Sequence, residues 1–194
     1  MISSEIVSNT YYRISLNRYA GTPLGFREEA ASRFSDPRID AGGVGLGTYA
    51  MVYAASDHTT AFAETVLGND HEFRSGPLTL DETADIRAHV VFEIVAEDPL
   101  LLVDMTDLGA LRLGMPTDAL RASAHGPARA WALAIHDHPA RPDGIAYPSR
   151  LTNRPTIAVF DRALEKLDAV ATTPLADHSD LSGVLDALEF VLAP

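Results

Sequence analysis

The sequence has no cysteine in its 194 residues. This absence excludes disulfides, a thiolate nucleophile and zinc held by cysteine. Long apolar runs are also missing, because the longest aliphatic run, residues 100–103, is far shorter than the ~20 residues that span a bilayer. The first residues, "MISSEIVSNTYYRIS", lack the basic and apolar regions of a secretory signal. We therefore expect a soluble cytoplasmic protein that does not enter a membrane.

Positive charge is scarce as well. Lys and Arg number 15 against 27 Asp and Glu, which gives a formal net charge of -12. A nucleic-acid surface needs clustered basic residues to displace counterions from the phosphates, so direct binding of nucleic acid is not expected. A small anionic ligand needs only a few local arginines, and Arg13, Arg33 and Arg150 are candidates.

The rest of the composition is that of a globular protein, with 46% hydrophobic and 22% charged residues. The length favours one domain over two, so we expect residues 1–194 to form a single unit. Strand and helix patterns follow one another along the chain, with a loop-rich stretch at 21–48, and predict an α+β fold. The predicted strands are 11–16, 51–54, "AHVVFEIVAED", "LLLVDM", "DGIAYPS" and "TIAVF", and the predicted helices are 57–67, the two halves of "TDALRASAHGPARAWALAIHDH" and an amphipathic C-terminal helix at about 180–192.

The run "MVYAASDHTTAFAET" changes from a short strand into a helix that contains Glu64. Ser56 or Asp57 is a suitable helix N-cap, and the glycine and asparagine at 68–69 are a stop signal. At 100° per residue, Glu64 falls at the edge of the apolar face of this helix. It is therefore either a solvated glutamate on the helix flank or a carboxylate held beside a pocket.

Three other motifs give weak signals. The glycine-rich "DAGGVGLGTYA" at 40–50 has the spacing of neither nucleotide-binding motif, G-x-G-x-x-G or G-x-x-x-x-G-K-S/T, and a predicted strand follows it. This favours a flexible glycine-rich connection over a phosphate-binding loop. In "HDHP", His136 and His138 point to different faces of a helix and have no obvious third ligand, so no metal site is expected. Ser149 in "AYPSR" lacks the elbow motif of a serine hydrolase.

Four segments, taken in order, resemble the RES-domain family, which is named for its arginine, glutamate and serine. They are "YYRIS" at 11–15, "SRFSD" at 32–36, "MVYAASDHTTAFAET" at 51–65 and "DGIAYPSR" at 143–150. The likeness covers roughly residues 11–160, and the family supplies the toxins of a large class of bacterial toxin–antitoxin pairs. The resemblance implies an ADP-ribosyltransferase-like fold, in which a mixed central β-sheet with flanking helices surrounds an NAD cleft.

The resemblance also implies which residues form the site. Glu64 and Arg13 match the positions expected to be catalytic, while Arg33, Tyr53 and Ser149 match positions expected to bind NAD or phosphate. These residue types suit cleavage of the nicotinamide-ribose bond, because a carboxylate stabilises the positive charge that develops on the ribose. Arginine forks pair with phosphate oxygens, tyrosine stacks on nicotinamide, and serine donates hydrogen bonds.

Ser32 and Ser35 depart from the family pattern, which usually has glycine and asparagine at these positions. The contribution of the loop around Arg33 is therefore an open question. If the departures weaken catalysis, the chain is a silent module that binds NAD or an antitoxin.

The acceptor of the ADP-ribosyl group is not settled by these residues. Our first hypothesis is a toxin that consumes NAD+ as a substrate, with phosphate or water as acceptor and with no cofactor; a protein ADP-ribosyltransferase is the alternative. The resemblance implies a small helical, Xre-like antitoxin as partner. The apolar stripe of the C-terminal helix leaves open both packing within the domain and pairing in a homo-oligomer.

Overall fold

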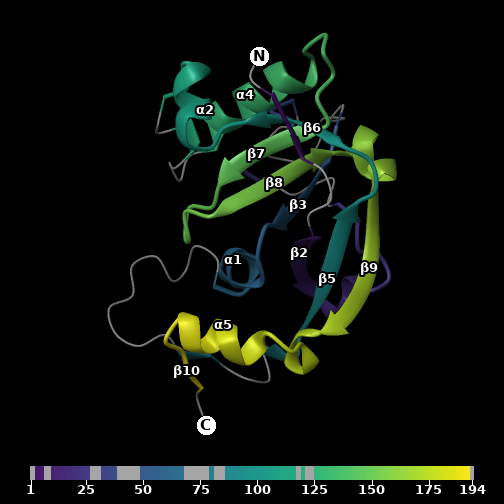
Figure 1. The fold of residues 1–194 in the computed structure, drawn as a ribbon, viewed down its shortest axis with the longest axis vertical. Helices are drawn as coiled ribbons and strands as arrows, with labels where there is room; N and C mark the ends of the chain where they lie inside the picture. The colour runs from purple at the N-terminus through teal and green to yellow at the C-terminus, as the bar shows by residue number, and fades with distance from the viewer. Residues whose placement is uncertain are drawn as a thin grey trace.

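The computed structural model describes residues 3–6, 10–26, 32–38, 49–67, 79–80, 86–116, 119–120 and 125–192 (Figure 1). Within these ranges eight strands form one sheet. They are β1 (Ser3–Ile6), β2 (Thr10–Leu16), β3 (Met51–Ala55), β5 (His89–Ala96), β6 (Leu100–Asp104), β7 (Gly144–Pro148), β8 (Pro155–Phe160) and β9 (Leu167–Pro174). Their order across the sheet is β1-β6-β7-β8-β3-β2-β5-β9.

The sheet is mixed, because β6 and β7 run parallel while its other neighbouring pairs are antiparallel. Figure 1 shows it twisting strongly between β7 and β9. The central strand β3 lies between β8 and β2, so it is hydrogen-bonded on both sides. The predicted α+β fold with a mixed central sheet and flanking helices is therefore confirmed.

Helices cover the sheet at two places. At one end, α2 (Asp107–Arg112) and α4 (Gly126–His136) lie beside β6 and β7 (Figure 1). The start of α4 agrees with the predicted break, since Pro127 occupies its first turn, where a missing N–H costs nothing. Nearer the other end, α1 (His58–Phe62) contacts β2, β3 and α5 (Leu181–Ala187). Phe62 is fully buried in this second group, and α5 adds Val184.

The C-terminal helix is shorter than predicted, since α5 ends at Ala187 instead of continuing to 192. Glu189 has a left-handed φ of 54°, and the Phe190 N–H donates to the Leu185 carbonyl at 3.0 Å. This is a Schellman-type ending made without glycine, so the sequence carried no stop signal. The chain then forms β10 (Val191–Leu192), which pairs in parallel with β4 (Thr79–Leu80). The apolar stripe of α5 packs within the domain against α1.

Other differences concern weaker patterns. The strands β1 and β9 were not predicted, and the helix predicted at 57–67 is α-helical only to Phe62, after which Ala63–Leu67 form a π-helical turn. The first half of the predicted central helix is described at 119–120, which are helical, and at His125, which is the N-cap of α4. The predicted stop signal at 68–69 and most of the glycine-rich segment 40–50 lie outside the described residues.

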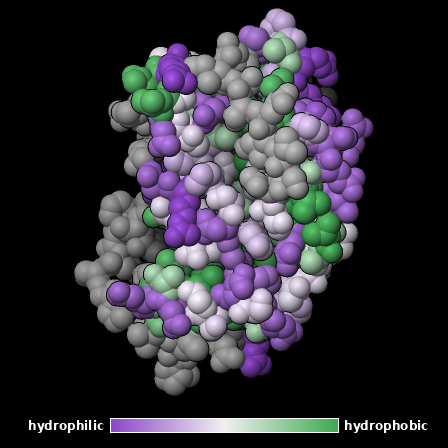
Figure 2. Space-filling model, viewed as in Figure 1, coloured by the Kyte–Doolittle hydropathy of each residue, from purple (hydrophilic) through white to green (hydrophobic). Residues whose placement is uncertain are grey.

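The surface exposes a few large apolar side chains. Leu108 and Leu111 on α2 are 60% and 73% exposed, and Figure 2 shows apolar residues gathered at the corner where α2 lies. Among the helices that the structure describes, none is both long and apolar enough to cross a bilayer.

Candidate functional site

A cavity of about 580 Å³ opens beside β2 and β3, next to the π-helical turn that follows α1. This volume is in the range of small-molecule sites. The cavity is lined by Tyr12, Arg13, Ile14, Ser15, Leu16, Phe26, Ser32, Arg33, Met51, Tyr53, Ala54, Ala55, Ala61, Glu64, Thr65, His89, His125, Tyr147, Arg150 and Thr156.

The structure brings the sequence-predicted site residues together around this cavity. Arg13, Arg33, Tyr53 and Glu64 line it directly. Ser149 does not, but its hydroxyl bonds the carboxylate of Glu64. These residues come from β2, the turn at 32–38, β3, the π-helical turn and the end of β7.

Glu64 owes its position to the way α1 begins and ends. Asp57 is the N-cap, and its carboxylate accepts from the Thr60 N–H at 2.9 Å. The helix changes to π geometry at Ala63, and such turns are frequent at functional sites. Ala63 and Leu67 are buried under the turn, while the side chain of Glu64 is exposed and lines the cavity. The flank position predicted for Glu64 therefore opens onto the pocket.

Ser149 fixes the Glu64 carboxylate. Its Oγ donates to Glu64 Oε1 at 2.5 Å and accepts from the N–H groups of Leu151 and Thr152, both at 3.1 Å. Only 2% of Ser149 is exposed, so this hydroxyl has little freedom to turn elsewhere. The charge-assisted hydrogen bond holds one carboxylate oxygen and leaves the other for a ligand.

Three arginines surround the cavity. Arg13 on β2 donates from Nη2 to the Gly25 carbonyl at 2.6 Å, and Arg33 donates from Nη1 to the Leu120 carbonyl. Burial lowers the pKa of Arg33, and the positive charge of Arg150 lowers it further. Two neighbouring cations favour an anion between them.

The turn that carries Arg33 is held by hydroxyl groups. Ser32 Oγ lies 2.6 Å from Ser35 Oγ and 2.7 Å from the Tyr53 hydroxyl, and the Ser32 N–H donates to Ser35 Oγ at 2.8 Å. The Tyr53 hydroxyl also accepts from the Phe34 N–H at 3.2 Å. The two serines that depart from the family pattern therefore make a network of their own that anchors the turn on β3.

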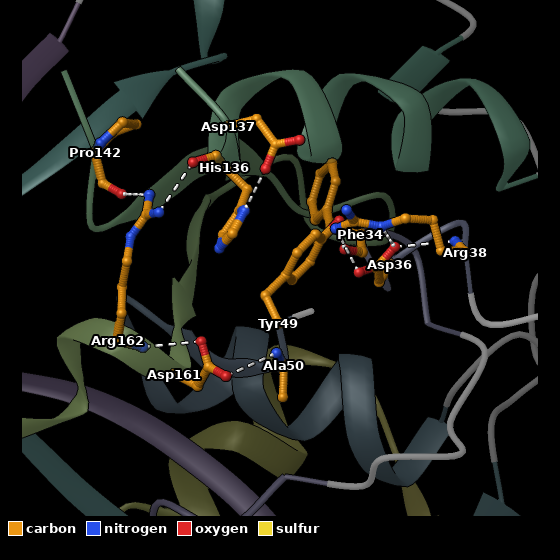
Figure 3. Close-up of polar contacts among 10 residues, drawn as sticks. All are labelled: Phe34, Asp36, Arg38, Tyr49, Ala50, His136, Asp137, Pro142, Asp161 and Arg162. Atoms are coloured by element: carbon orange, nitrogen blue, oxygen red, sulfur yellow. Dashed lines mark hydrogen bonds and ion pairs between the residues drawn. The ribbon is translucent and has the colours of Figure 1, made fainter. Parts of the chain in front are cut away.

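A second group of contacts fixes the far side of the same turn (Figure 3). The buried Asp36 accepts from Arg38 Nε at 2.8 Å and from its Nη2 at 2.7 Å, and the Tyr49 hydroxyl donates to the Phe34 carbonyl at 3.2 Å. The ring of Tyr49 stacks on His136 with the centroids 4.6 Å apart. The turn that carries Arg33 is thus held by contacts on both sides of this residue.

The histidines of "HDHP" have local partners. His136 Nδ1 lies 2.8 Å from Asp137 Oδ1, and His138 Nδ1 accepts from the Ala140 N–H at 3.1 Å. Arg162 donates to the His136 and Pro142 carbonyls, which ties the end of α4 to the neighbouring loop (Figure 3). The residues of this motif therefore take part in local hydrogen bonds that hold the end of α4 in place.

Tyr147 is the pocket residue that sequence reasoning missed most clearly. It is 7% exposed, and burial raises the pKa of its hydroxyl, with further contributions from Tyr53 and Glu64. Its ring packs edge-on against Phe34 with the centroids 4.8 Å apart. Tyr147 stands within "DGIAYPSR", two residues before Ser149, and residues two apart in the predicted strand "DGIAYPS" face the same side of the sheet, so that spacing was the available signal.

Comparisons with known proteins give three findings. Residues 10–182 match the family model described as RES domain. The probable toxin y4kH of Sinorhizobium fredii (strain NBRC 101917 / NGR234) is 37% identical over 131 residues, which are 66% of this chain and 98% of that protein. The crystal structure of the M. tuberculosis MbcT–MbcA toxin–antitoxin complex contains a chain with a TM-score of 0.64 and 14% identity, and the match covers 96% of this chain and 92% of that one. At this identity the structural likeness bears on the fold alone.

Proposed function

The chain belongs to the RES-domain family, and from that premise we propose that it is the toxin of a toxin–antitoxin pair and cleaves the nicotinamide-ribose bond of NAD+. Phosphate or water would receive the ADP-ribosyl group. The relative that carries the name of a probable toxin supports the first part of the proposal. The pocket supports the second.

One observation carries the enzymatic proposal. The Glu64 carboxylate is fixed by Ser149 at a cavity that Arg13, Arg33 and Arg150 also line. The pocket thus pairs one oriented negative charge with a group of positive charges. NAD+ has the complementary pattern, since its ribose becomes positive during cleavage and its pyrophosphate is negative.

In the proposed reaction, the bond between the nicotinamide nitrogen and the ribose carbon breaks, and its electron pair leaves with nicotinamide. An oxygen of phosphate or water then forms the new bond to that carbon, and a water acceptor releases its proton to solvent. Glu64 would stabilise the positive ribose, and the arginines would hold the pyrophosphate. The rings of Tyr53 and Tyr147 give the pocket aromatic surface on which nicotinamide would stack.

A phosphate acceptor is favoured by the surplus of cationic groups. The positive charge of Arg150 lowers the pKa of Arg33, and Arg13 adds a third positive charge. A pyrophosphate and an incoming phosphate would together neutralise them. A protein acceptor is the second candidate.

We also propose an Xre-like antitoxin as the partner. The fold neighbour is a toxin solved together with its antitoxin. On this chain, the exposed Leu108 and Leu111 of α2 are apolar surface that a helical partner would bury. Co-purification with a tagged, neighbour-encoded antitoxin tests this proposal, and failure of that protein to bind or neutralise the chain would refute it.

The deciding experiment follows NAD+ by NMR with purified protein in phosphate buffer and in phosphate-free buffer. Glu64→Gln is the test variant, and Glu97→Gln, which removes the same charge at an exposed position outside the pocket, is the control. Phosphate-dependent release of nicotinamide that only Glu64→Gln abolishes supports a phosphorylase. Release in both buffers indicates hydrolysis. No release in either buffer, or full activity in folded Glu64→Gln, overturns the proposal.

A further inference from the structure

His58, the first residue of α1, is a buried imidazole that lacks hydrogen-bond partners. Only 5% of it is exposed, and neither ring nitrogen is hydrogen-bonded to any described residue. Buried polar atoms are nearly always satisfied, so two unsatisfied nitrogens in one ring indicate a missing ligand, an ion or a water. His58 does not line the cavity described above, so that site leaves it unexplained.

Two further donor groups face His58 from the segment that leads into α5. His178 is 8% exposed, and its ring centroid lies 4.2 Å from that of His58. Asp180, the exposed residue before α5, completes the group, because one donor atom from each of these three residues lies within 4.8 Å of the other two. Two imidazoles and a carboxylate are ligands that Zn²⁺ and related ions prefer.

The existing contacts of His178 are long. Its Nδ1 accepts from the Asp180 N–H at 3.3 Å, and its Nε2 lies 3.8 Å from Glu93 Oε1. Both distances exceed the common range for an N–H···O bond, so a metal ion would displace weak interactions only. The ligand atoms, which lie within 4.8 Å of one another, would be about 3.4 Å apart in a tetrahedral site, which follows from metal–nitrogen bonds of about 2.0–2.1 Å.

The surrounding charge favours a cation. Besides Asp180, Glu93 places Oε1 3.8 Å from His178 Nε2, and Asp57 is the N-cap of the helix that His58 begins.

We propose that His58, His178 and Asp180 bind one divalent transition-metal ion of the Zn²⁺ type, with water in the open position. The ion joins the start of α1 to the segment before α5, and α5 itself already packs against α1. Its role is structural, since the ligands lie outside the pocket. It would nevertheless stiffen α1, whose continuation holds Glu64, and Tyr12 lies between the ion and the cavity.

The test uses the full chain without an affinity tag, freed of metal with a chelator. Zn²⁺ is titrated calorimetrically, and Co²⁺ is added separately to record the visible absorption of a low-coordinate ion. We expect one ion per chain with a dissociation constant on the order of micromolar or below. His58→Ala and His178→Ala abolish this binding, and Asp180→Asn, at an exposed position, weakens it about tenfold or more without unfolding the chain.

The matched controls are His138→Ala and Asp137→Asn, which remove a half-buried imidazole and an exposed carboxylate elsewhere and should bind as the wild type does. The proposal is overturned if the wild type shows no saturable binding, or if folded Asp180→Asn and His58→Ala bind Zn²⁺ as tightly as the controls. Because the readout is binding and absorption, the outcome does not depend on whether the chain consumes NAD+.

Discussion

Ser149 and Glu64, which lie 85 residues apart in the chain, meet through a 2.5 Å hydrogen bond at the edge of the pocket. The serine hydroxyl is itself oriented by the N–H groups of Leu151 and Thr152, both at 3.1 Å. The direction of the carboxylate is therefore set by the turn that follows β7, far along the chain from the helical segment that carries Glu64. Ser149 is a positioning residue for Glu64.

Removing this hydroxyl should lower kcat more than it changes KM. Ser149→Ala frees the carboxylate, and loss of a hydrogen bond to a charged group, about 1.5–3 kcal/mol, corresponds to a decrease of roughly 10- to 100-fold. Steady-state kinetics of NAD+ consumption measure the effect. Ser149→Thr, which keeps a hydroxyl, should recover most of the activity. Equal kcat values for folded Ser149→Ala and wild type would contradict the positioning role.

The arginines of the pocket should act on substrate binding. Arg150→Gln removes one of two neighbouring cations and should raise KM for NAD+ about tenfold, the equivalent of about 1.4 kcal/mol, with a smaller effect on kcat. Arg112→Gln, at the exposed end of α2, removes the same charge away from the pocket and serves as the control. If both variants change KM alike, only the overall charge matters.

The hydroxyl network around Arg33 gives a prediction about coupling. Ser32→Ala and Tyr53→Phe each remove one partner of a 2.7 Å hydrogen bond and should each reduce the free energy of unfolding by about 1 kcal/mol. Since both remove the same bond, the double variant should lose less than the sum, by about 0.5–1 kcal/mol. Urea unfolding of the four proteins measures this energy. Additive losses would mean that the two hydroxyls do not interact.

Two glycines should respond to alanine in opposite directions. A Cβ at Gly144 on β7 would lie 2.3 Å from the Ala158 carbonyl oxygen, so Gly144→Ala should destabilise the protein by about 3 kcal/mol or more. A Cβ at Gly183 in α5 would meet nothing within 4 Å, so Gly183→Ala should stabilise the protein by about 0.5–1 kcal/mol. Thermal unfolding compares the pair. A tolerated Gly144→Ala would show that β7 and β8 can move apart.

Elements with a strong local pattern were predictable. The strand His89–Ala96 and the helix Gly126–His136 have dense apolar patterns and clear boundaries, and both are confirmed. The strand Leu167–Pro174 was missed because it is an edge strand with alternate residues exposed and a proline at its end, which weakens the apolar signal. The end of α5 was missed because Glu189 adopts the left-handed conformation that glycine usually marks.

For the site, the sequence indicated residue types but not their contacts. Glu64 could be placed on a helix flank by periodicity, and the order of motifs suggested its companions. No local pattern encodes the bond from Ser149, the proximity of Arg33 to Arg150 or the pairing of His58 with His178, because each depends on how distant strands and turns meet. Their roles in catalysis and binding stay predictions until the variants are measured.

The order of strands in the sheet bears on when the pocket first exists. Met51 pairs with Phe160 and Ser3 with Val103, so the neighbours of the earliest strands are translated much later. At roughly 5–20 residues per second, the 85 residues between Glu64 and Ser149 take roughly 4–17 s to synthesise. During that interval the nascent chain has the carboxylate but not the hydroxyl that orients it. The proposed activity of this chain therefore begins only after β8, the strand that pairs with β3, has been synthesised.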